Sequence, residues 1–225
     1  MASEICIPTL DIDPYDEKSL LDPYPMHEQI RESGPVVWLE KYQVFACGRH
    51  QEVHTILNNW ETFISSAGVG LTNFNVEPPS RPKSLILEQD PPFHTQTRAI
   101  LSRILSPKTV TIIREIFTKV AEDMLDECLK KGSIDGIKDL ARPYPLKVFP
   151  DAVGLEEEGR ENLLLYGDMI FNSMGPKNEL AAKSVERAQS SINWVVAHCM
   201  RNHLRPGGFG DQIYQAADAG ELAGC

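Results

Sequence analysis

Apolar residues recur at helical spacing in two long stretches of the chain. Residues 107–131 carry one such stripe, formed by Ile113, Ile116, Phe117, Val120, Met124 and Cys128. Residues 179–203 carry a second, formed by Val185, Ala188, Ile192, Val195 and Cys199. This periodicity is typical of helices that turn one face toward a core. We therefore predict two long amphipathic helices, the first ended by Gly132 and the second broken before Pro206.

Shorter patterned segments precede these helices. Residues 23–33 predict a short helix ended by Gly34, and residues 50–59 predict another. Between them, residues 36–39 and 43–47 alternate around Glu40 and Lys41, which predicts a β-hairpin. Residues 65–89 show no period, and irregular connections of more than about 12–15 residues are usually functional or disordered. The expected fold class is mainly α with a small β-hairpin or sheet.

A further helix is expected after the sequence Asp90-Pro91-Pro92. Asp90 is predicted to cap it, Pro91 to take its first position, and Pro107 to end the run. His94 and Arg98 are four residues apart, so they project from one helix face and can bind one anionic group together. The alternative is an ordinary solvated helix face.

Composition limits the possible functions. The net charge of −10 and the pI near 5.1 argue against nucleic-acid binding, because a phosphate backbone requires a basic surface. No apolar run approaches the ~18 residues needed to cross a bilayer, so no membrane span is expected. The five cysteines form no Cys-x-x-Cys or Cys/His cluster, and we predict no metal site and a reducing, cytoplasmic location. Cys128 and Cys199 are interpreted as small core residues.

The string Asp-Pro-Pro-x-His-x-x-x-Arg resembles the C-helix signature of bacterial cytochromes P450. Segments 22–66 and 146–180 resemble the same family's helix A, first hairpin and helix B, and its E and F helices. The resemblance implies that His94 and Arg98 hold a propionate of haem b. It also implies that residues 1–225 are the N-terminal portion, helices A to G, of a single P450 domain of about twice this length.

The catalytic motifs of the family are not recognisable in the chain. The resemblance would require an acid-alcohol pair on a long helix, a Glu-x-x-Arg brace and a Cys loop that supplies the iron ligand. None of the five cysteines has that setting, and the spacing of Glu28 and Arg31, or of Glu157 and Arg160, is interpreted as a chance match. We therefore assign no catalytic residue and expect this chain alone to be inactive.

The loop before Asp90 carries a finer resemblance. Residues 80–92 resemble the same stretch of the bacterial P450s that oxidise para-substituted benzoic acids. This implies that Arg81 and Ser84 bind the substrate carboxylate and that Leu87 packs beside the ring. Phe171 and Met174, three apart on one expected helix, would face the same pocket, although both positions tend to be aromatic in those relatives. A solvated Arg81 and a core Met174 are the alternatives.

The implied activity is insertion of one oxygen atom from O2 into a small aromatic carboxylate, by hydroxylation or O-demethylation. Electrons would come from an iron–sulfur ferredoxin and its reductase. Residues 98–119 hold five basic residues and one acidic residue, and the resemblance makes this stretch the ferredoxin-docking face. A solvated face is the alternative there. A second hypothesis for the chain is a non-catalytic, truncated helical ligand-binding fragment.

Overall fold

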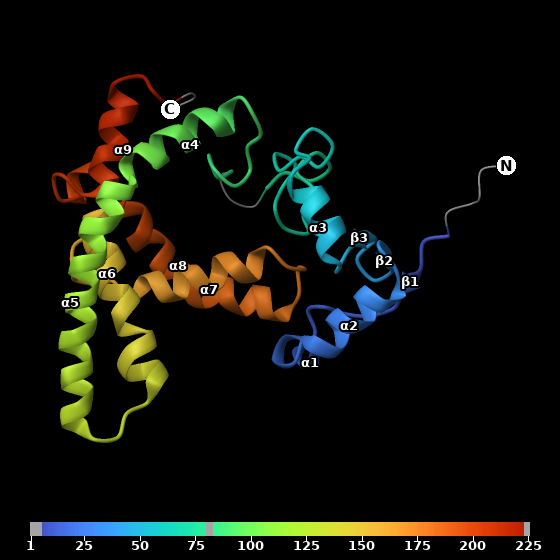
Figure 1. Ribbon diagram of the computed structural model, residues 1–225, viewed down its shortest axis with the longest axis horizontal. Helices are drawn as coiled ribbons and strands as arrows, with labels where there is room; N and C mark the ends of the chain where they lie inside the picture. Colours follow the sequence, from blue (N-terminus) through green and yellow to red (C-terminus); the bar gives the residue numbers. More distant parts are fainter. Residues whose placement is uncertain (1–5, 80–82, 223–225) are drawn as a thin grey trace. The chain divides into compact units, whose positions relative to one another are not determined.

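A computed structural model gives the fold of residues 6–79 and 83–222 (Figure 1). The chain divides into two compact units: residues 1–83 with 174–176, and residues 84–173 with 177–225. Within the described residues the chain is mainly helical and has one small sheet, as the sequence predicted. No helix in this part of the chain combines the length and apolar character that crossing a membrane requires.

The first unit contains the sheet, formed by β1 (Thr9–Leu10), β2 (Val37–Leu39) and β3 (Val44–Ala46). β2 and β3 are antiparallel and form the predicted hairpin, with Trp38 opposite Phe45. β1 joins the other edge of β2 in parallel and was not predicted, because two residues are too few to show an alternation.

Three helices accompany this sheet: α1 (Glu17–Leu21), α2 (Tyr24–Ser33) and α3 (His50–Leu57). Ile30 of α2 is buried with Val37 and Leu39, and these three side chains form the core of the unit. α2 ends before Gly34 as predicted. α3 ends two residues earlier than predicted, where the Asn59 amide donates to the carbonyl of Ile56 in a tighter turn and the Asn58 side chain donates to the carbonyl of His54.

The second unit is entirely helical in its described residues. Its elements are α4 (Phe93–Ile104), α5 (Pro107–Lys131), the π-helix η1 (Gly136–Ala141), α6 (Pro143–Val153), α7 (Asn162–Ser173), α8 (Glu179–His198), the 3-10 helix η2 (Arg201–His203) and α9 (Phe209–Asp218). α7 and α8 lie side by side, α5 packs along α6, and α4 packs against α9 (Figure 1).

The predicted bounds of α5 are confirmed. Ser106 caps its first turn through its side chain, Pro107 occupies the first helical position, and Gly132 follows the last turn with φ 80°. Within the stripe, Cys128 is buried as expected. Ile116 is 56% exposed, so its place in the buried stripe was wrong.

Two other helix boundaries were predicted incorrectly. α8 ends at His198 rather than residue 203, because the backbone becomes extended at Met200, and Cys199 is exposed instead of buried. α4 begins at Phe93 rather than at Pro91, and its N-cap residue, Pro92, makes no side-chain capping bond. Pro92 offers no amide at the second position of the expected helix, which leaves Asp90 one fewer donor to cap.

α9 was not among the helices predicted from the sequence. Its apolar residues Phe209, Ile213 and Ala216 are spaced by four and three, a helical signal that the sequence analysis did not use. Ala216 is buried, and the other two are partly buried around it.

Candidate functional site

α4 presents His94 and Arg98 on one face. His94 is half-buried and Arg98 is exposed, and among the described residues neither side chain has a hydrogen-bonding or ion-pair partner in the protein. The pair therefore retains its N–H donors. An imidazole and a guanidinium one turn apart suit a carboxylate, which accepts charge-assisted hydrogen bonds from both.

The opposite side of α4 fixes its orientation. Ile100 and Ile104 are buried against Ala216 of α9, and at 100° per residue they lie about 120° around the helix from His94 and Arg98. An ion pair between Arg103 and Glu221, 2.5 Å long, joins α4 to the segment after α9. The buried contacts of Ile100 and Ile104, rather than this exposed ion pair, orient the His94 and Arg98 face away from the buried side of α4.

Ser84 begins a turn directly before α4. Its Oγ accepts the amides of Ile86 and Leu87 at 3.3 and 3.1 Å, and its own amide donates to Oε2 of Glu88 at 2.8 Å. The Ser84 hydroxyl hydrogen is not used in these bonds, so it remains able to donate to a ligand. Glu88 is 1% exposed, and sequence reasoning missed this buried carboxylate, whose only signal was its place after three apolar residues.

The remaining predicted substrate-binding residues fall in different parts of the chain. Arg81 lies outside the described residues. Leu87 is 51% exposed and belongs to the second unit, as does Phe171 of α7, which is 76% exposed. Met174 belongs to the first unit.

Met174 is not on the same helix as Phe171, contrary to the prediction. α7 ends at Ser173, and the carbonyl of Met174 accepts the amide of Leu71 at 2.9 Å. Gly70 permits this approach, because a Cβ there would lie 2.5 Å from that carbonyl oxygen. The following Gly175-Pro176 sequence also disfavours continuation of the helix.

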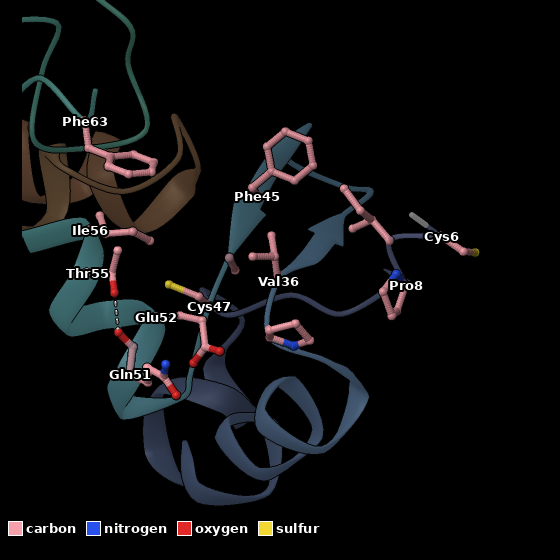
Figure 2. A pocket seen from close by; sticks show the side chains of 13 residues that line it. Cys6, Pro8, Val36, Phe45, Cys47, Gln51, Glu52, Thr55, Ile56 and Phe63 are labelled. Atoms are coloured by element: carbon pink, nitrogen blue, oxygen red, sulfur yellow. Dashed lines mark hydrogen bonds between the residues drawn. The ribbon is translucent and has the colours of Figure 1, made fainter. Parts of the chain in front are cut away.

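A cavity of about 570 Å³ lies within the first unit, between the sheet and α3 (Figure 2). Its walls are mostly apolar and include Phe45, Ile56 and Phe63. Oε2 of Glu52 is buried there with no hydrogen-bonding partner among the described residues. Burial, and then the charge of Glu52, raises the pKa of the Cys47 thiol, so this thiol is disposed to remain protonated. Sequence reasoning did not find this cavity.

The described cysteines do not form an iron-ligand site. Cys128 is buried within α5, and its sulfur lies 3.8 Å from the carbonyl oxygen of Asp139. Cys6 and Cys199 are exposed, and Cys47 lines the cavity of the first unit. The described residues fit the propionate side of a haem through His94 and Arg98, and they do not supply the thiolate.

The basic stretch is partly neutralised. Arg103 pairs with Glu221, and Lys119 pairs with Asp123 four residues on. In the described part of the chain Arg98, Lys108 and Arg114 have no acidic partner, and all three are exposed. This leaves three uncompensated positive charges on α4 and α5.

Comparisons with known proteins show which proteins the chain resembles. The chain is 50% identical over 217 residues to cytochrome P450 CYP199A2 of Rhodopseudomonas palustris, which covers 96% of this chain and 53% of that protein. It is 28% identical over 156 residues to cytochrome P450 109 of Bacillus spizizenii, covering 69% of this chain and 36% of that protein. No protein-family model matches the chain.

Solved structures agree on the fold. CYP109E1 from Bacillus megaterium, solved in complex with testosterone, superposes with a TM-score of 0.72 at 22% identity, over 92% of this chain and 53% of that one. CalO2 superposes with a TM-score of 0.69 at 20% identity, over 95% of this chain and 55% of that one. Over nearly its whole length the chain is thus similar to part of bacterial cytochromes P450, and these relatives are haem-thiolate monooxygenases. It corresponds to the N-terminal part of that fold and spans about half the length of the first of these relatives.

Proposed function

We propose that residues 1–225 form the N-terminal portion of a single cytochrome P450 domain that oxidises a para-substituted benzoate. The complete protein, meaning these residues joined to the remainder of the family's length, would be a cytoplasmic monooxygenase. The observation that carries the proposal is the pair His94 and Arg98, held on α4 without side-chain partners among the described residues, in a chain 50% identical to CYP199A2.

His94 and Arg98 would hold a propionate of haem b through charge-assisted hydrogen bonds. When bound, a thiolate-ligated haem supplies the activation of O2 and the insertion of one oxygen atom into a C–H bond. The thiolate would come from the part of the complete protein outside these 225 residues. The 225-residue chain by itself would then be inactive.

The loop before α4 would orient the substrate. Ser84 would donate its free hydroxyl hydrogen to the substrate carboxylate, and Arg81 would add a guanidinium beside it. Leu87, exposed in the described residues, would pack against the aromatic ring, while Phe171 and Met174 would line the remainder of the pocket. A benzoate anchored at its acid end presents its para substituent at a fixed distance, and such positioning is the protein's main contribution to the rate.

The electron donor would be an iron–sulfur ferredoxin, reduced by its own reductase. With Arg98 paired to the propionate, Lys108 and Arg114 still leave positive charge on α5, within a chain whose net charge is −10. An acidic ferredoxin would be attracted to this local patch, and the encounter would slow as salt is added.

A second candidate function is a non-catalytic helical ligand-binding fragment. The absence of a ligand-loop cysteine from these 225 residues favours it for the chain as it stands. The cavity beside Glu52 would be the binding site of such a fragment.

Turnover of para-methoxybenzoate tests the main proposal. With ferredoxin, its reductase and reduced pyridine nucleotide, the complete protein is expected to consume O2 and release equal amounts of formaldehyde and para-hydroxybenzoate. The ortho isomer, whose methoxy group lies beside the anchored carboxylate, is the matched control and should react far more slowly. Equal turnover of both isomers, or none of either, would contradict the substrate assignment.

A further inference from the structure

Two histidines and a glutamate converge in the second unit, away from the residues assigned to haem and substrate. One ligand atom from each of Glu156, His198 and His203 lies within 4.8 Å of the other two. We propose that these three residues form a site for a divalent transition-metal ion of the zinc type. The proposal concerns this chain alone and does not depend on the oxidase function.

The loop that carries Glu156 is held from beneath by Arg160. This guanidinium is buried, and its residue is 5% exposed. Its Nε donates to the carbonyl of Glu156 at 2.7 Å, and its Nη2 donates to the carbonyl of Leu155 at 2.6 Å and to Oδ1 of Asp151 at 2.8 Å. Glu156 therefore extends from a fixed backbone although its carboxylate is exposed.

The segment that carries His203 is tied to the same loop. The Arg205 amide donates to the carbonyl of Gly154 at 2.8 Å, and its Nη2 donates to Oδ1 of Asp151 at 3.0 Å. Asp151 thus bridges the two arginines that hold the two segments. Gly208 allows its own backbone to approach that of Val153 closely, because a Cβ at residue 208 would lie 2.5 Å from the carbonyl oxygen of Val153.

His198 is prepared to act as a ligand. Its Nδ1 lies 2.8 Å from the carbonyl oxygen of Trp194, and a carbonyl only accepts, so Nδ1 must carry the hydrogen. In the neutral ring the lone pair is then on Nε2. Histidines that bind metals characteristically donate their other ring nitrogen to a carbonyl or carboxylate in this way. Stacking on Trp194, with ring centroids 4.2 Å apart, further restricts the ring.

His203 completes the set. Its Nδ1 is 3.9 Å from Oε1 of Glu156, and its ring centroid is 5.1 Å from that of His198. Ligands around a tetrahedral zinc ion stand about 3.4 Å apart, given metal–ligand distances of ~2.0–2.1 Å. A small rotation of the exposed Glu156 side chain can shorten the 3.9 Å distance between its Oε1 and the Nδ1 of His203 to this value. Two imidazoles and one carboxylate favour zinc or nickel over calcium or magnesium, which prefer oxygen ligands.

Calorimetric titration of the purified 225-residue chain with ZnCl2 at neutral pH tests the site. We expect one tight site per chain. His203→Gln and Glu156→Gln should each weaken it by about tenfold or more, since even the loss of an outer hydrogen-bonding partner costs 10–100-fold in metal affinity. Far-UV circular dichroism of each variant checks that the helices are retained. If His203→Gln fails to fold, the zinc affinity of Glu156→Gln, a change at an exposed side chain, is compared with that of the unsubstituted chain.

His54→Gln is the matched control. His50 and His54 lie one turn apart on α3, with ring centroids 5.9 Å apart, and form a two-histidine pair that also attracts metals. The tight site should survive this substitution unchanged. Unaltered affinity in folded Glu156→Gln and His203→Gln, loss of the site in His54→Gln, or no zinc binding by the unsubstituted chain would each overturn the proposal.

Discussion

Replacing Arg81 by Ala in the complete protein is expected to weaken the binding of a para-substituted benzoate by roughly 10- to 100-fold. A buried hydrogen bond to a charged group contributes about 1.5–3 kcal/mol, and each ~1.4 kcal/mol is tenfold in affinity. The matching benzamide carries no charge to pair with Arg81, so its affinity should change much less. Titration of both ligands, followed by the spectral change on binding, measures the difference.

Lys83→Ala supplies the matched control for this loop. The Lys83 Nζ donates to the carbonyl of Ser66 at 3.0 Å and lies 5.2 Å from the centre of the Phe74 ring, so it is already engaged within the first unit. Its removal should leave the ratio of acid to amide affinity unchanged. If acid and amide lose affinity equally in Arg81→Ala, Arg81 is not the carboxylate ligand and the aromatic-acid assignment fails with it.

Replacing Arg98 by Ala should have a different consequence, because it would remove a contact to the haem propionate rather than a contact to the substrate. We expect haem to be lost about tenfold faster, since one charge-assisted hydrogen bond to a propionate disappears. Transfer of haem to an excess of apomyoglobin measures the rate. The loss should be the same with and without any benzoate.

Arg103→Ala is the control on the same helix. Arg103 pairs with Glu221 and does not share the face of Arg98, so its removal should leave haem transfer near the unsubstituted rate. Equal acceleration in both variants would show that a general loosening of α4 is responsible, and the propionate assignment would then be wrong.

The sequence predicted elements best where local signals agree. α5 has a serine cap, a proline at its first position and a terminal glycine, and its predicted bounds are those observed. α8 lacks such an end signal, so the prediction extended it past His198. β1 is held by pairing with β2, which residues distant in the chain provide and a local window cannot show.

The candidate sites also differ in whether local sequence signals or contacts between distant residues form them. His94 and Arg98 were found because one helical turn connects them in the sequence. Glu156 and His203 are far apart in the chain, and Arg160 and Arg205, which both bond to Asp151, help to hold their segments together. Met174 was misplaced for a related reason, because its carbonyl bonds to Leu71 across the first unit instead of continuing α7.

The carbon-monoxide difference spectrum of the reduced, haem-loaded protein tests the central claim most directly. That claim is that these 225 residues hold the propionate side of the haem site and that the thiolate lies in the remainder of the complete protein. The account predicts the red-shifted Soret band of a thiolate-ligated haem from the complete protein and none from the 225-residue chain. The same band from the 225-residue chain, or its absence from the haem-loaded complete protein, would contradict the account.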